Sequence, residues 1–311
     1  MPNERFPVEK PAVLKSSTPG SHRLIRLVWL AGYVLLLAAV GLMVLGAPES
    51  RIVAITAAGL FVGGIVAYLV RHGRYLATLS RGARALEAGD LGTARKIVAP
   101  LVDRYPAFWP VQRLAGLILY PSGDPLSAAT LLESAAKHAH DRELVVTLVA
   151  SYAALNKAGD ARRAAAMRPN EPDVALALAW AELVALGGDH SRGAALAAAL
   201  PSDSPSRAAM AATLQAIAAA HRHDADAVRA RLADAEGRYV SLAGDERAFL
   251  GYLGGVALRE LGAFEDARAT FTFAMDAAPE TIGEALARRE RTHLPSASGS
   301  PVSSSDQPSS D

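Results

Sequence analysis

The 311-residue sequence contains no cysteine, and this absence excludes disulfides, thiolate catalysis and cysteine-ligated metal sites. No excess of one charge is present either, since 32 basic and 31 acidic residues leave a formal net charge of +1. Nucleic-acid-binding domains are usually strongly basic, so the charge balance argues against a nucleic-acid partner. Alternating strand patterns joined by hairpin dipeptides are also missing, while alanine and leucine dominate. The composition therefore predicts an all-α protein.

Most motifs of known catalytic chemistry are missing as well. The sequence has no H-E-x-x-H, G-x-S-x-G, Walker loop or G-x-G-x-x-G. Ser134 and Lys137 match the S-x-x-K motif of serine acylation, but the companion S-D-N and K-T-G elements are absent. We therefore expect a non-enzyme without catalytic residues or cofactor. A membrane-bound, hydrolase-like enzyme using Ser134 and Lys137 stays the alternative.

Two pairs of histidines raise the question of a metal site: His138 with His140, and His221 with His223. Residues two apart on a helix point to different faces, and metal sites need convergent ligands with supporting hydrogen bonds. Both pairs also fall where the chain is expected to turn in solvent. The sequence thus predicts no metal ligand at either pair.

Long apolar runs, by contrast, are present near the start of the chain. Residues 27–47 and 52–70 carry no charged side chain. As helices they extend roughly 31 and 28 Å, and the hydrocarbon core of a bilayer is about 30 Å thick. We predict a transmembrane hairpin with helices at 24–47 and 52–70 and a short exoplasmic loop at 48–51.

The basic residues around this hairpin predict its orientation. Five precede the first run and four follow the second, whereas the loop carries only Arg51. By the positive-inside bias both ends and everything after the hairpin are cytoplasmic, most simply at a bacterial inner membrane. Gly59 and Gly63 form a G-x-x-x-G pair on which another helix, from the same chain or a second copy, can pack closely. Residues 1–23 and 294–311 are proline-punctuated and apolar-poor, which predicts disordered tails.

The rest of the chain shows an internal repeat. Turn glycines at Gly89, Gly123, Gly159, Gly188 and Gly262 are separated by 34, 36, 29 and 74 residues. The last gap is about two periods and holds a degenerate copy around His223. Each clear copy has a small residue five positions after its glycine, where two helices of a pair press together. These residues are Ala94, Ala128, Ala164, Gly193 and Ala267.

Local capping signals agree with paired helices. Asp124 and Ser204 each precede a proline, which places a capping side chain ahead of proline at the first helical position. Thr281 and Glu284 form a capping box for a last helix that ends near Arg291.

The repeat resembles the tetratricopeptide repeat, a 34-residue helix-turn-helix unit. The best copy runs through Gly255, Gly262, Phe264, Ala267, Phe271, Ala274 and Pro279. The resemblance implies an α-α solenoid over 75–293, with about six helix pairs and a capping helix. It also implies a concave groove for a partner peptide or helix. Carried over position by position, that groove is lined by Arg113, Tyr120, Asn156, Glu182, Tyr252 and Arg259.

Together these patterns predict an integral membrane adaptor. The hairpin would fix a cytoplasmic solenoid that binds a partner protein or assists assembly of a membrane complex. The layout of two spans followed by repeats also resembles a bacterial inner-membrane family associated with haem biosynthesis, which stays a second interpretation of the same architecture.

Overall fold

The structure is a computed structural model that describes residues 33–34, 37 and 50–295. These residues form α-helices and one short 3-10 helix, and within these ranges there is no strand. The chain divides into two compact units, residues 1–118 and 119–311, so the predicted repeat region 75–293 is shared between them. For the part of the chain described, the predicted all-α fold is confirmed.

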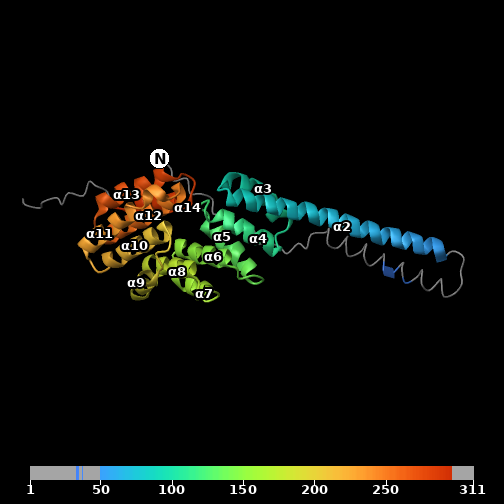
Figure 1. Ribbon diagram of the computed structural model, residues 1–311, viewed down its shortest axis with the longest axis horizontal. Coiled ribbons are helices and arrows are strands. Elements are labelled where there is room, and N and C mark those ends of the chain that lie inside the picture. The colour runs from blue at the N-terminus through green and yellow to red at the C-terminus, as the bar shows by residue number, and fades with distance from the viewer. Residues whose placement is uncertain (1–32, 35–36, 38–49, 296–311) are drawn as a thin grey trace, which may run out of the picture. The chain divides into compact units, whose positions relative to one another are not determined.

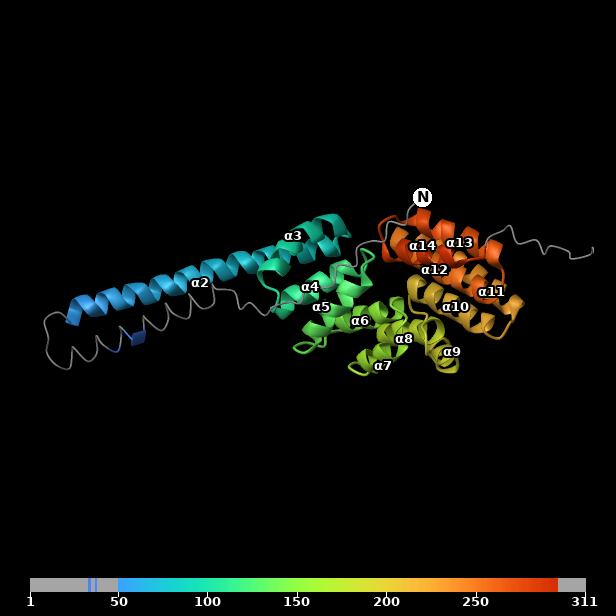
Figure 2. The same ribbon diagram turned by 180° about the vertical axis from the view of Figure 1, so that it is seen from behind.

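The first unit contains α2 (Ser50–Glu87), α3 (Leu91–Arg104) and α4 (Trp109–Leu119). In Figures 1 and 2, α3 runs alongside the C-terminal part of α2. Gly82 makes this contact close, because a Cβ atom there would lie 2.7 Å from Val98 and 3.4 Å from Leu114. Tyr75, Leu101 and Val111 form a buried cluster in this unit.

The structure describes the two predicted membrane helices to different extents. Residues 24–47 lie outside the described residues, apart from 33–34 and 37. Residues 52–70 belong to α2, which begins at Ser50, so the second half of the predicted loop 48–51 is helical. Among the described residues, no helix has the length and apolar character needed to cross a membrane. The predicted tail 1–23 and residues 296–311 of the predicted tail 294–311 also lie outside the described residues.

The second unit is built from stacked helix pairs. The first helices of the pairs, α6, α8, α10 and α12, contact one another in succession, and α14 follows α12. The second helices, α7, α9, α11 and α13, each pack against their own partner and against the next first helix, as in Figure 2. The bounds are α5 Pro125–Ala136, α6 Arg142–Ala154, α7 Ala158–Ala165, α8 Pro172–Val184, α9 His190–Ala199, α10 Pro205–Ala220, α11 Ala225–Glu236, η1 Tyr239–Ser241, α12 Gly244–Glu260, α13 Phe264–Ala277 and α14 Ile282–His293.

The turns within the pairs are marked by residues with positive φ. These are Gly89, Gly123, Asn156, Gly187, His223 and Gly262. Their successive separations of 34, 33, 31, 36 and 39 residues are more even than those of the predicted turn glycines. Asn156 and His223 take the left-handed conformation that glycine takes elsewhere, which asparagine and histidine tolerate better than most residues.

Two predicted turn positions are therefore wrong. Gly159 lies inside α7, three residues after the true turn residue Asn156, and Gly188 follows the true turn residue Gly187. The error arose because glycine was used as the marker, whereas the left-handed backbone conformation is what the turn requires.

The small residues and the caps at Asp124 and Ser204 are as predicted, and of the predicted capping box the structure shows one half, with Thr281 accepting from Glu284 N–H at 3.5 Å. Each predicted alanine after a turn is at most 2% exposed. A Cβ atom at Gly193 would lie 2.7 Å from Leu183, so no larger residue fits that helix contact without movement. The Asp124 carboxylate accepts from Ser127 N–H at 3.0 Å, and the Ser204 hydroxyl accepts from Arg207 N–H at 3.3 Å.

Candidate functional site

The predicted groove residue Tyr252 lies inside an aromatic cluster of the second unit. Its ring centroid is 6.3 Å from that of Trp180 on α8 and 5.9 Å from that of Phe249 on α12. Trp180 and Phe249 meet edge to face at 4.9 Å. Burial, with the nearby carboxylate of Glu290 as the next cause, raises the pKa of Tyr252 to about 12. Tyr252 is 1% exposed, so its side chain meets other residues of this unit, and its predicted contact with a partner stays a prediction.

Glu182 on α8 is buried and accepts hydrogen bonds and ion pairs from α7 and from the start of α9, a set of contacts that we call the clamp. Its two carboxylate oxygens accept from Nε and Nη2 of Arg162 on α7, at 2.7 and 2.6 Å. One of them also accepts from Asp189 N–H at 2.8 Å, and Arg192 approaches the other at 3.6 Å. Burial alone would raise the pKa of Glu182, but the hydrogen bonds from Arg162 and Asp189 and the two arginine charges lower it overall.

The side chain of Glu182 is 0% exposed, and its predicted contact with a partner stays a prediction as well. The carboxylate joins α7, α8 and the start of α9.

Arg259 near the end of α12 is half-buried and paired with its own chain. It forms ion pairs with Glu260 and with Glu290 of α14, and Glu290 is itself buried. Tyr120 is half-buried, and burial raises its pKa, with the nearby Tyr252 as the second cause. Asn156 is the turn residue with φ 59°, not a residue of a first helix. Arg113 lies on α4 in the other unit.

The last helix, α14, contacts segments that lie far from it in the sequence. Ile282 N–H, at the start of α14, donates to Pro121 O at 2.9 Å, and Arg289 donates to Ala154 O at 2.9 Å. Gly283 allows α14 to approach α12 closely, since a Cβ atom there would lie 2.6 Å from Phe249 N. Thus α14 reaches from the loop before α5 to the end of α6 while it packs on α12.

Four of the residues considered for chemistry lie in α5 or directly after it. Ser134 is half-buried in α5, and Lys137 is the exposed C-cap residue of that helix. His138 and His140 are exposed. Across the described residues, no group of three or more histidine, aspartate or glutamate side chains is arranged to hold a metal ion.

His221 instead stacks on a histidine that the sequence did not connect with it. The ring centroids of His221 and His190 are 3.7 Å apart, with the planes 12° from parallel. Nε2 of His221 lies 2.8 Å from Leu183 O. Partial burial and the neighbouring His221 lower the pKa of His190.

An exposed apolar surface lies on the second unit at the turn between α11 and α12. We call it the Val240 patch and define it as Tyr239, Val240 and Phe273. Val240 is 98% exposed and Phe273 is 42% exposed. The rings of Tyr239 and Phe273 stack with centroids 5.9 Å apart and planes 6° from parallel. Sequence reasoning missed this patch, although a Tyr-Val pair in a connection between two helices was a signal for it.

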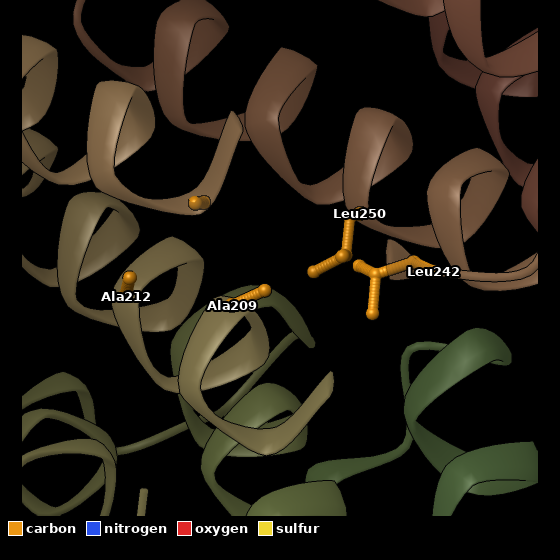
Figure 3. Packing of buried hydrophobic residues seen from close by; sticks show 5 residues of the cluster. Ala209, Ala212, Leu242 and Leu250 are labelled. Atoms are coloured by element: carbon orange, nitrogen blue, oxygen red, sulfur yellow. The ribbon is translucent and has the colours of Figure 1, made fainter. Parts of the chain in front are cut away.

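The Val240 patch is held from beneath by a core cluster. Tyr239 packs against the buried residues Ala209, Ala212, Ala235, Leu242 and Leu250. Figure 3 shows Leu242, from the end of the turn, beside Leu250 of α12, with Ala209 and Ala212 on α10. Val240 therefore projects from a turn that is anchored on both sides, by Tyr239 before Val240 and by Leu242 two residues after it.

Comparison with known proteins gives limited information. No family model matches the sequence, and no curated protein does. Among solved structures, the chain is similar to a tetratricopeptide repeat protein from Parabacteroides merdae ATCC 43184. The match has 14% sequence identity and a TM-score of 0.48, and it covers 83% of this chain and 98% of that chain. The fold assignment made above depends on the helix pairing within this protein and not on that match.

Proposed function

We propose that this protein is a membrane-anchored scaffold whose stacked helix pairs hold a partner protein. The observation that carries the binding part is the Val240 patch. An apolar side chain as exposed as Val240, next to a half-exposed Phe273, leaves apolar surface in water that a partner can cover. Aromatic side chains such as Tyr239 and Phe273 also contribute strongly to protein interfaces.

The packing beneath the patch supports this proposal. Because Tyr239 is fixed by the core cluster and by the stacked ring of Phe273, little side-chain freedom is lost when a partner binds. A scaffold of this kind needs no reaction, and we assign none. The partner side of the interface is expected to be a shallow apolar pocket that accepts the Val240 side chain.

Site-specific photocrosslinking in cells tests the binding part. A photoreactive residue at position 240 should give a discrete protein adduct. The matched control is position 236, because Glu236 is exposed and ends the helix before the turn. Introducing Tyr239→Ser should abolish the adduct from position 240. Identical adducts from positions 236 and 240, or none from 240, would contradict this choice of surface.

The membrane part of the proposal is supported by the sequence. Residues 27–47 and 52–70 are uncharged, and basic residues flank the pair. Val62 and Val66, which are four positions apart on α2 and therefore on one face, are 57% and 52% exposed. We propose spans at 24–47 and 52–70 in a bacterial inner membrane, with the helix pairs on the cytoplasmic side.

Gly59 and Gly63 are the proposed packing positions within the second span. Apart from neighbouring residues and the nearby backbone of α2 itself, no atom in the described part of the chain lies within 4 Å of a Cβ atom built on either glycine. This space can accept the first span or a second copy of the chain. Crosslinking of full-length protein distinguishes them, since Gly63→Ile should reduce a dimer band only if two copies pack there.

Cysteine labelling tests the spans. The chain has no cysteine, so Val62→Cys introduces a single thiol. In intact cells and in nanodiscs this thiol should be protected from a membrane-impermeant maleimide, whereas Glu87→Cys in nanodiscs should react. Equal reaction at both positions would contradict the second span.

A further inference from the structure

The connection between α3 and α4 brings several aromatic and basic residues next to the part of α2 that follows the proposed second span. Tyr105 and Phe108 of this connection meet the ring of Tyr75 on α2 edge to face, with centroids 5.0 and 5.3 Å away. Tyr75 is 8% exposed, whereas Phe108 is 38% exposed. The guanidinium of Arg104 lies 5.8 Å from the centre of the Tyr105 ring.

The distance of this connection from the span is fixed by α2. The helix runs without a break from Ser50 to Glu87 and contains no proline. Tyr75 follows residue 70 by five positions, which is about 7.5 Å along the axis. The headgroup layer on each side of a bilayer is roughly 5–8 Å thick. The rings in contact with Tyr75 therefore lie at the height of the headgroups if residues 52–70 span the hydrocarbon.

The connection has a defined conformation. Gln112 Nε2 donates to Pro106 O at 2.6 Å. Backbone N–H groups of Phe108 and Val111 donate to Tyr105 O and Phe108 O, each at 3.0 Å. The exposed face of Phe108 is thus presented by a folded turn, not by a loose segment.

The charges and residue types at this height favour a lipid surface. Arg74 and Arg104 are exposed, and the exposed Asp103 precedes Arg104 in the sequence. Tyrosine, tryptophan and phenylalanine next to arginine are typical of residues that sit among headgroups, where rings meet the apolar boundary and cations meet phosphates. Trp109, half-buried at the start of α4, adds a further ring.

We propose that Tyr105, Phe108, Arg74 and Arg104 form a surface that binds the headgroups of anionic phospholipids. This inference rests on the proposed second span. It goes beyond anchoring, because it makes the lipid a ligand of the folded part of the protein and predicts a preference for anionic over zwitterionic headgroups.

Fluorescence quenching in nanodiscs tests the surface. An environment-sensitive fluorophore is attached to full-length protein through Ala107→Cys, which keeps all the aromatic side chains, or through Glu87→Cys as the control. Glu87 is 17 positions beyond residue 70, about 26 Å along the axis. Headgroup-spin-labelled lipid should quench the probe at 107 several-fold more than the probe at 87.

The anionic preference is tested in the same samples. Quenching at 107 should be stronger in phosphatidylcholine discs that contain phosphatidylglycerol than in phosphatidylcholine alone. Each of Arg74→Glu and Arg104→Glu should lower the apparent affinity for the anionic lipid at least about fivefold. Quenching that does not depend on phosphatidylglycerol would overturn the anionic preference.

The outcomes separate failure of this surface from failure of the span. If Val62→Cys is protected but the probes at 107 and 87 are quenched equally, the span stands and the lipid surface is wrong. If Val62→Cys reacts freely, the span is wrong and the lipid surface, which depends on it, is wrong as well.

Discussion

Replacing Glu182 by alanine removes the acceptor of the clamp between α7, α8 and α9. The variant leaves the Arg162 guanidinium without its two hydrogen bonds at 2.7 and 2.6 Å, and Asp189 N–H without its bond at 2.8 Å. Glu182 itself is 0% exposed, so its methylene groups also leave an unfilled space in the packing.

The expected loss of stability follows from these contacts. Breaking a buried ion pair by removing one partner costs about 3–5 kcal/mol. The Arg162 side chain is 34% exposed, so water partly replaces its lost bonds and the lower end, about 3 kcal/mol, is expected. In a unit of this size each kcal/mol shifts the melting temperature by about 2–4 °C, which gives a decrease of about 6–12 °C.

Thermal unfolding of the full chain, followed by circular dichroism, measures this decrease. Arg192→Ala is the matched control, because Arg192 is 51% exposed and 3.6 Å from the same carboxylate, and it should cost less than about 1 kcal/mol. The pKa of Glu182 is lowered in the folded state. The free energy of unfolding of the wild-type protein should therefore exceed that of a Glu182→Gln variant above pH 4.5, and this difference should be lost as the pH falls through the folded-state pKa. A melting temperature of Glu182→Ala equal to that of Arg192→Ala would refute the reasoning.

Two further predictions concern packing and pH. Gly255→Ala places a Cβ atom 2.4 Å from the Phe271 ring and should destabilise by about 1–3 kcal/mol in the same thermal assay. Gly159 of α7 is the control, because a Cβ atom built there meets no other side chain within 4 Å. Gly159→Ala should be neutral or stabilise the protein by up to about 1 kcal/mol, and equal changes in stability for the two variants would contradict the packing argument. The pKa of His190 is lowered from 6.5, so its unfolded state binds more protons and stability should fall as the pH drops through 6.5. His190→Asn should flatten this dependence between pH 7.5 and 5.5, and an unchanged slope would argue against the role of the His190–His221 stack.

Helix caps and helix contacts could be predicted from the sequence because they depend on short segments. Asp124 caps α5 through the residue three positions later, a relation that the local sequence contains in full. A small residue such as Ala267 after a turn likewise indicates close packing against one neighbouring helix, and Ala267 is buried as expected. The turn at Asn156 was displaced because two residue types can adopt positive φ, and only the backbone shows which one does.

The side chains that a partner meets could not be predicted in the same way. The repeat pattern predicts that Tyr252 and Glu182 line a groove, and the structure shows both of them buried. Whether such a groove is open depends on contacts from segments distant in the chain. Here the ring of Trp180 on α8 contacts Tyr252, and Arg289 of α14 donates a hydrogen bond to Ala154 O. A periodic pattern contains no information about how strongly successive pairs curve.

The sequence by itself determined the all-α composition, the paired helices, their capping residues and the two uncharged runs, because each depends on neighbours within one or two helical turns. Tertiary structure alone decided which polar groups are buried and which apolar groups remain exposed. Glu182 is covered and Val240 is left in solvent because exposure is set by contacts among segments far apart in the chain.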